Sequence, residues 1–279
     1  MTRLDAGPPE ASAPTACEGP EALLLEAREV PLGGVRGMEV HRSLPQSALP
    51  MVGAWCFLDR FGPQTARMRV EPHPHIGLQT VTWPFVGEVR HRDVLGSDVI
   101  VRRGVLNLMT SGGATATVVV GTFGGAASPA TMYTPIAGVE VHLPAGASVT
   151  LPLEPAWEYA LVGVGGEPAV QTDAEASIDL ADQSLLYLGL GREAIEVTAE
   201  RDATVFVLGG EPFESDIVMW WNFVARTHEE IVDARDAWEA EGVPGAAQPR
   251  FGHVVDHGDE RIPAPPLPAV RLTPRRRRD

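Results

Sequence analysis

The sequence predicts an all-β protein that contains two antiparallel β-barrels in tandem and one short helix near the C-terminus. The first observation is that short apolar or alternating runs, separated by Gly, Pro and Asp, recur from residue 29 to about residue 123. Frequent short strands with turn residues between them are typical of β-sandwiches and barrels. The second observation is that a similar series follows from residue 138 to residue 210, which indicates a duplicated barrel.

Within each series, strands are expected where β-branched and aromatic residues alternate with polar ones. The first series lies at residues 38–44, 54–59, 67–71, 78–86, 88–93, 98–102, 105–110 and 114–123. A linker is expected at residues 124–135. The second series lies at residues 138–144, 148–153, 158–164, 169–172, 176–180, 184–190, 194–199 and 203–210.

The predicted helix runs from Thr227 to Glu241. Thr227 is suited to the N-cap, and Glu230 follows it at the spacing of a capping box. Gly242 and Pro244 end the helical pattern. Apolar side chains recur at helical intervals and predict a stripe that packs on a barrel: Ile231, Ala234 and Trp238.

Both ends of the chain have the composition of tails. Residues 1–20 are rich in Pro, Ala, Gly and Glu and are expected to be disordered. The expected organisation is therefore a tail at 1–20, an N-terminal barrel at 21–135, a C-terminal barrel with the helix at 136–245 and a Pro/Arg-rich tail at 246–279. The four arginines Arg275–Arg278 predict a solvated end; the alternative is a nucleic-acid contact.

The charge of the chain limits the classes of partner that its folded body can bind. A net charge of -15 and a pI of 4.9 mean that the folded body should repel nucleic acid and anionic membranes. All 22 basic residues are arginines, which excludes lysine Schiff-base chemistry.

No apolar run approaches the length of a membrane span, and the N-terminus lacks a signal peptide pattern, so a cytoplasmic location is expected. Cys17 and Cys56 suggest no disulfide framework, and Cys56 is expected to be a small buried hydrophobe.

The stretch most suggestive of chemistry begins with His73, Pro74 and His75. Side chains two residues apart in an extended segment point the same way, so both imidazoles should converge on one point. A β-barrel commonly presents two metal ligands in this manner. Residues 79–85 then alternate β-branched and aromatic side chains up to Gly87, which predicts a strand with inward-pointing histidines followed by a hairpin.

Several motifs together make the sequence resemble one family. They are HPHIGLQTV, VGEVRHRD and MTSGG, followed by FLDRFGP, LPAGASVTLPL and GGEPFESDIVMWWNFVARTHEEI. The chain is similar to the pirin family of bicupins over residues 23–268. The resemblance implies two stacked antiparallel barrels of the jelly-roll or cupin type, with one metal, usually iron, in the N-terminal barrel. Members of this family are described as transcriptional co-regulators and redox sensors, or as quercetin-type dioxygenases.

The resemblance also implies four metal-ligand positions. The family's two HPH histidines are His73 and His75 here. The family's remaining ligands form a His-x-Glu pair eight residues after a Met-Thr dipeptide, and this register falls on Thr117 and Val119. Alternation along the expected strand supports the register, because it places three residues on one face: Thr115, Thr117 and Val119.

Half of the family's metal-ligand set is therefore replaced, and the glutamate that usually follows the HPH strand is Gln79. Two neutral imidazoles without a carboxylate hold a divalent ion weakly, and the 2-His-1-carboxylate arrangement of oxygen-activating iron cannot be assembled from these positions. No obvious substitute exists in the first barrel. His91 belongs to the HRD element, whereas Glu71 and Asp59 are expected to be turn residues.

The remaining inward positions define a candidate cavity. Gln79, Trp83, Thr117 and Val119 are the candidate lining residues, because cupin barrels direct alternate residues inward. They either fill the barrel or form a pocket for a small organic ligand. His142, the lone histidine of the second series, is expected to be structural.

Two functions follow from these observations. The first is a non-enzymatic pirin-like bicupin that binds a partner protein or a small organic ligand, with its divalent metal, iron by resemblance, weakly bound or absent. The alternative is a metal-dependent quercetin 2,3-dioxygenase-like oxidoreductase that uses His73, His75 and an unidentified third ligand. A Glu or Asp carboxylate that points into the first barrel, as a third ligand beside the two histidines, would favour the enzyme.

Overall fold

The computed structural model describes residues 19–32, 38–62, 70–103, 107–109, 114–172, 177–242, 249–258 and 260–274. The predictions for residues 1–18, Pro244 and Arg275–Arg278 concern parts of the chain outside these ranges. Internal contacts divide the chain into two units. Among the described residues, we call them the HPH unit (70–103, 214–242, 249–258 and 260–274) and the large-sheet unit (19–32, 38–62, 107–109, 114–172 and 177–213).

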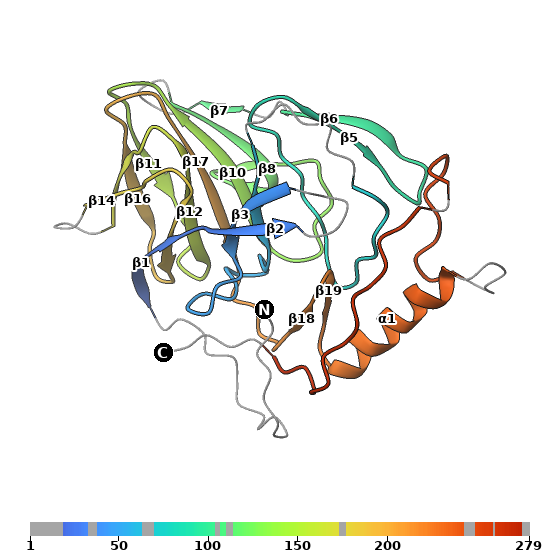
Figure 1. The fold of residues 1–279 in the computed structure, drawn as a ribbon. Helices are drawn as coiled ribbons and strands as arrows, with labels where there is room; N and C mark the ends of the chain where they lie inside the picture. Colours follow the sequence, from blue (N-terminus) through green and yellow to red (C-terminus); the bar gives the residue numbers. More distant parts are fainter. Residues whose placement is uncertain are drawn as a thin grey trace. The chain divides into compact units, whose positions relative to one another are not determined.

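The large-sheet unit is built on one antiparallel sheet with the order β1-β15-β12-β17-β10-β8-β7, and β9 pairs with β8 (Figure 1). Its strands are β1 (Pro20–Glu26), β7 (Asn107–Met109), β8 (Thr115–Phe123), β9 (Ala126–Ala127), β10 (Ile136–Leu143), β12 (Glu158–Gly165), β15 (Ser184–Gly189) and β17 (Ala203–Gly210). A second sheet has the order β11-β16-β13-β14. Its strands are β11 (Ser148–Pro152), β13 (Ala169–Gln171), β14 (Ser177–Asp179) and β16 (Ala194–Thr198).

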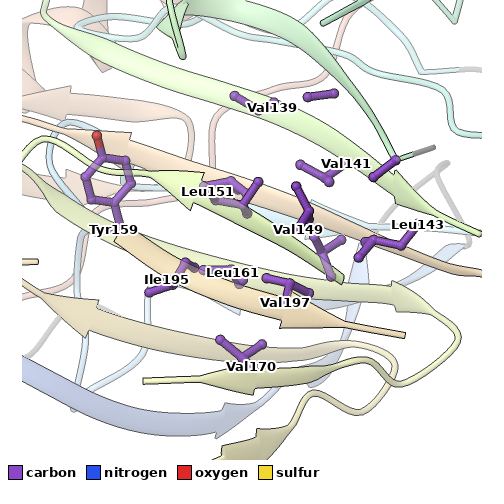
Figure 2. Close-up of a cluster of buried hydrophobic side chains, with 14 of the residues drawn as sticks. Val139, Val141, Leu143, Val149, Leu151, Tyr159, Leu161, Val170, Ile195 and Val197 are labelled. Carbon is purple, nitrogen blue, oxygen red and sulfur yellow. The ribbon is translucent and has the colours of Figure 1, made fainter. Parts of the chain in front are cut away.

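The main core lies where these two sheets face each other (Figure 2). Exposed and buried residues alternate along β11 and β16, so each strand sends one face into the core and the other into solvent. Val149 lies opposite Val197, and Leu151 lies opposite Ile195. The two packed sheets are of the jelly-roll type, which confirms the all-β fold class. Four strands of the main sheet, β1, β7, β8 and β9, come from the residues expected to form the N-terminal barrel.

The opposite face of the main sheet is covered by residues 38–62. This segment contributes β3 (Met38–Leu44) and β4 (Leu58–Arg60), which form a small sheet with β2 (Arg28–Leu32). The indole Nε1 of Trp55 donates a hydrogen bond to the carbonyl oxygen of Gly209 at 3.1 Å. Gly53 has a φ of +50°, and a Cβ there would lie 2.9 Å from the backbone of Gly210. Only glycine allows this approach of the segment to β17.

The HPH unit contains a hairpin of β5 (Glu88–Arg92) and β6 (Asp98–Arg102), a second hairpin of β18 (Val218–Trp220) and β19 (Phe223–Ala225), and the helix α1 (His228–Glu241). The helix confirms the sequence prediction. Thr227 is its N-cap, and both hydrogen bonds of the capping box with Glu230 are present. The predicted stripe is buried in a core shared with β18 and β19: Ile231, Ala234 and Trp238. Within the described ranges, no helix is long and apolar enough to span a membrane.

The predicted strand at residues 78–86 is wrong, because these residues form no ladder. Just before this stretch, Ile76 makes an isolated parallel bridge to Phe223. Gly77 has a φ of +64° and turns the chain, while Pro84 has no N–H to donate to a neighbouring strand. Asp59 was expected in a turn but lies within β4. Cys56 is buried, as expected.

Candidate functional site

The two histidines of the HPH motif lie next to each other in the HPH unit. Their ring centroids are 4.9 Å apart with an angle of 66° between the planes. Nδ1 of His73 is 2.9 Å from the carbonyl oxygen of Glu71. Because a carbonyl oxygen can only accept, this nitrogen carries the proton, and Nε2 of the neutral ring has the lone pair. Nδ1 of His75 lies 3.2 Å from the hydroxyl of Thr80. The two rings are therefore close together, although residues 73–75 form no strand. Their convergence on one metal ion stays a prediction.

The backbone around the pair is fixed by its contact with β19. The amide of Val224 donates to the carbonyl oxygen of Ile76 at 3.0 Å. A Cβ on Gly77 would lie 2.1 Å from the carbonyl oxygen of Val224, so glycine is required at this position. The buried Phe223 thus anchors the residue that follows His75.

The two remaining family positions lie on β8, in the large-sheet unit. Thr117 is 6% exposed and faces Glu140 of β10 in the register. The register then shifts: Val118 pairs with Val139, and Val120 pairs with Gly138. Val119 is therefore the extra residue of a β-bulge. The predicted alternation through Thr115, Thr117 and Val119 is interrupted at its last member, because the bulge gives β8 one residue more than its partner.

Sequence reasoning missed a buried carboxylate beside Thr117. Glu140 is 2% exposed, and its register places it on the same face of the sheet as Thr117. The signal was present in GVEVHLP, where alternation puts Glu140 and His142 on the face opposite the core valines. His142 contacts the hydroxyl of Thr204 at 3.3 Å. Glu140 belongs to the second series of strands, whereas the predicted metal site takes all its ligands from the first series.

Three other residues that could replace the missing metal ligands contact other side chains in the structure. Asp59 forms a two-point ion pair with Arg42, with N···O distances of 2.7 and 2.6 Å. His91 is exposed on β5, 3.6 Å from Asp93. Glu71, expected in a turn, is 8% exposed and contacts a histidine from the C-terminal segment.

The candidate cavity residues are divided between the units. Gln79 is exposed and Trp83 is half-buried in the HPH unit, while Val119 is half-buried in the large-sheet unit. Whether these residues and Thr117 line one pocket stays a prediction.

The donor types at the four family positions do not fit the metal that the family implies. They offer two imidazoles, one neutral hydroxyl and one hydrocarbon. A 2-His-1-carboxylate iron centre needs an anionic oxygen that none of these positions supplies.

Comparisons with known proteins agree with the architecture. The sequence profile described as "Pirin" matches residues 37–116, and the one described as "Pirin C-terminal cupin domain" matches residues 138–244. A "putative quercetin 2,3-dioxygenase" of Pseudomonas aeruginosa is 34% identical over 88% of this chain and 90% of its own length. A "pirin-like protein" of Caulobacter vibrioides is 28% identical over 78% of this chain and 93% of its own length. The crystal structure of a quercetin 2,3-dioxygenase from Acinetobacter baumannii superposes with a TM-score of 0.80 at 28% identity, over 91% of this chain and 98% of that one.

Proposed function

Because the chain belongs to the pirin family of bicupins, we propose that it is a binding protein for a partner protein or a small organic ligand and that it does not catalyse flavonol oxidation. The observation that supports the proposal is the replacement of the family's second ligand pair by Thr117 and Val119. A site that keeps His73 and His75 alone has no anionic ligand to offset the charge of a divalent ion.

The remaining imidazoles suit a different role. His73 is held by the carbonyl oxygen of Glu71, and the ring of His75 is exposed. Such rings can donate to or accept from oxygen-rich groups of a ligand without any metal. The net charge of -15 argues against nucleic acid as the partner of the folded body.

The test is the metal content and oxygen consumption of protein purified without an affinity tag. Wild type is compared with the His73→Ala/His75→Ala double variant, and His91→Ala is the matched control, because His91 is an exposed histidine of the same unit. We expect no metal that depends on the HPH pair and no oxygen uptake with quercetin. Near-stoichiometric iron, zinc or nickel that disappears only in the double variant, together with oxygen uptake, would contradict the proposal.

A second candidate is a metal-dependent quercetin 2,3-dioxygenase. It is favoured by the names of two relatives, one 34% identical in sequence and one with a TM-score of 0.80. It also agrees with the close approach of the His73 and His75 rings. This candidate requires a third, anionic ligand from outside the family's four positions. The same experiment decides between the two candidate functions, since only the enzyme needs a metal whose binding depends on His73 and His75.

A further inference from the structure

A group of side chains of metal-ligand type lies within the HPH unit, at other positions than the family's ligands. It contains Glu71, His257 and Glu260, whose ligand atoms all lie within 4.8 Å of one another. Nε2 of His257 is 2.5 Å from Oε2 of Glu71, across 186 residues of sequence. Glu71 is buried and His257 is largely buried, whereas Glu260 is exposed at the edge. The group therefore has a buried side and a solvent-exposed side.

The backbone holds this group in place. The amide of Ile262 donates to the carbonyl oxygen of Pro72 at 2.9 Å, so the C-terminal segment runs beside the residue that follows Glu71. A turn presents His257, with its amide 3.3 Å from the carbonyl oxygen of Val254. The residues on either side of His257, Asp256 and Gly258, have φ values of +58° and +75°. Such a conformation is uncommon for an aspartate, so the turn is closely defined.

The neighbouring Arg261 contacts α1. Arg261 follows Glu260 directly, but its guanidinium lies over the ring of Trp238, 4.0 Å from the centroid. It is 3.7 Å from a carboxylate oxygen of Glu239 on α1. The side chain of Arg261 thus points to the helix, while the two glutamates and the histidine gather around one another.

We propose that Glu71, His257 and Glu260 bind a divalent first-row transition metal ion. One imidazole and two carboxylates form a donor set that suits Zn²⁺ and Mn²⁺. Bonds of about 2.0–2.2 Å in a tetrahedral site place ligand atoms ~3.3–3.6 Å apart. Starting from separations within 4.8 Å, side-chain rotation brings the carboxylates to that distance, and the 2.5 Å contact between His257 and Glu71 opens by about 1 Å. The ion takes the place of that hydrogen bond.

This site uses other ligand atoms than the HPH pair, although Glu71 contacts both His73 and His257. The carbonyl oxygen of Glu71 accepts from His73, and its carboxylate faces His257. An ion held by the carboxylate would also tie residues 254–262 to residues 71–73. The same C-terminal segment supplies Ala264 and Leu272 to the core around α1. The metal would therefore stabilise the HPH unit.

The alternative is an ordinary histidine–carboxylate contact that anchors the C-terminal segment without metal. The full chain, stripped with a chelator, is titrated with Zn²⁺ and separately with Mn²⁺ by calorimetry. The variants are Glu260→Gln and His257→Gln, with His253→Gln as the matched control, because His253 is an exposed histidine of the same segment. The His73→Ala/His75→Ala variant is included to separate the two sites.

We expect one ion per chain in wild type, in His253→Gln and in the HPH double variant. Loss of one ligand in Glu260→Gln should weaken binding by at least about tenfold. Since Glu260 is exposed, this variant should keep the wild-type circular dichroism, and any loss of binding then reflects the ligand. Zn²⁺ should also raise the melting temperature of wild type but not of Glu260→Gln. Binding that is unchanged in Glu260→Gln and His257→Gln, or absent from wild type, would overturn the proposal.

Discussion

The carboxylate of Glu158 is the contact that we expect to matter most for the stability of the large-sheet unit. It is 8% exposed and accepts two hydrogen bonds, one from the hydroxyl of Tyr187 at 2.6 Å and one from the amide of Gly53 at 2.7 Å. The first bond joins β12 to β15, and the second joins the main sheet to the segment that covers it. Truncation in Glu158→Ala leaves both buried donors without this acceptor.

The expected loss in the free energy of unfolding depends on how many buried donors lose Glu158 as their acceptor. Loss of the acceptor costs about 1–3 kcal/mol for each buried donor, so Glu158→Ala should lower the free energy of unfolding by about 2–6 kcal/mol. Tyr187→Phe removes one donor and leaves the bond from Gly53, so we expect a loss of about 1.5–3 kcal/mol, the range for a hydrogen bond to a charged group. The double variant should cost less than the sum, because both changes remove the same bond.

The assay is urea unfolding followed by circular dichroism, with Glu200→Ala as the control. Glu200 is exposed in a turn of the same unit, so its removal should change stability by no more than about 0.5 kcal/mol. If the two units unfold in separate steps, only the step of the large-sheet unit should move. A cost for Glu158→Ala no greater than that of the control, or strict additivity with Tyr187→Phe, would refute the role assigned to this carboxylate.

Three further predictions concern the HPH unit. Thr227→Ala removes the N-cap of α1 and should cost about 1 kcal/mol in thermal unfolding, whereas Thr227→Ser should be nearly neutral. Gly77→Ala places a Cβ 2.1 Å from the carbonyl oxygen of Val224 at a φ of +64°, so we expect a loss of at least about 2 kcal/mol and altered histidine signals in NMR spectra. The pKa of Asp98 is lowered from 3.8 to about 2, first by its side-chain hydrogen bonds from Arg90. The ionised carboxylate therefore stabilises the β5–β6 hairpin above pH 3.8, and amide protection of this hairpin should fall as the pH drops from there towards 2, but not in Asp98→Asn.

The parts of the fold that were predictable are those decided by neighbours in sequence. The capping box and the apolar stripe of α1 act within one or two turns, and both are present as predicted. Strands β11 and β16 bury every second residue against the main sheet, so alternation alone located them. Strands β12 and β15 of the main sheet are buried on both faces and were located by their continuous apolar runs. The run at 78–86 also alternates β-branched and aromatic residues but forms no ladder. A strand also needs a partner strand, and its presence is not a local property of the sequence.

The candidate site was less predictable because it depends on pairing between distant segments. The bulge at Val119 follows from the register of β10 against β8, with Gly138 facing Val120. No pattern within β8 signals this extra residue. The proximity of Glu71 to His257 likewise depends on how the C-terminal segment returns to the start of the HPH stretch. For Glu140 the signal was local, but its relevance became clear only when the register placed it opposite Thr117.

The two proposals bear on one another through a single measurement. Metal found in the purified protein would ordinarily be taken as support for a dioxygenase, given the names of the relatives. In this chain the same result is expected from Glu71, His257 and Glu260 without any ligand from the HPH pair. Metal that survives His73→Ala/His75→Ala and is lost in Glu260→Gln leaves the binding function intact, because it is held apart from the family's ligand positions. Flavonol oxidation requires metal that is lost in His73→Ala/His75→Ala and kept in Glu260→Gln. The dependence of the metal on these two sets of side chains, rather than its presence, therefore decides the function.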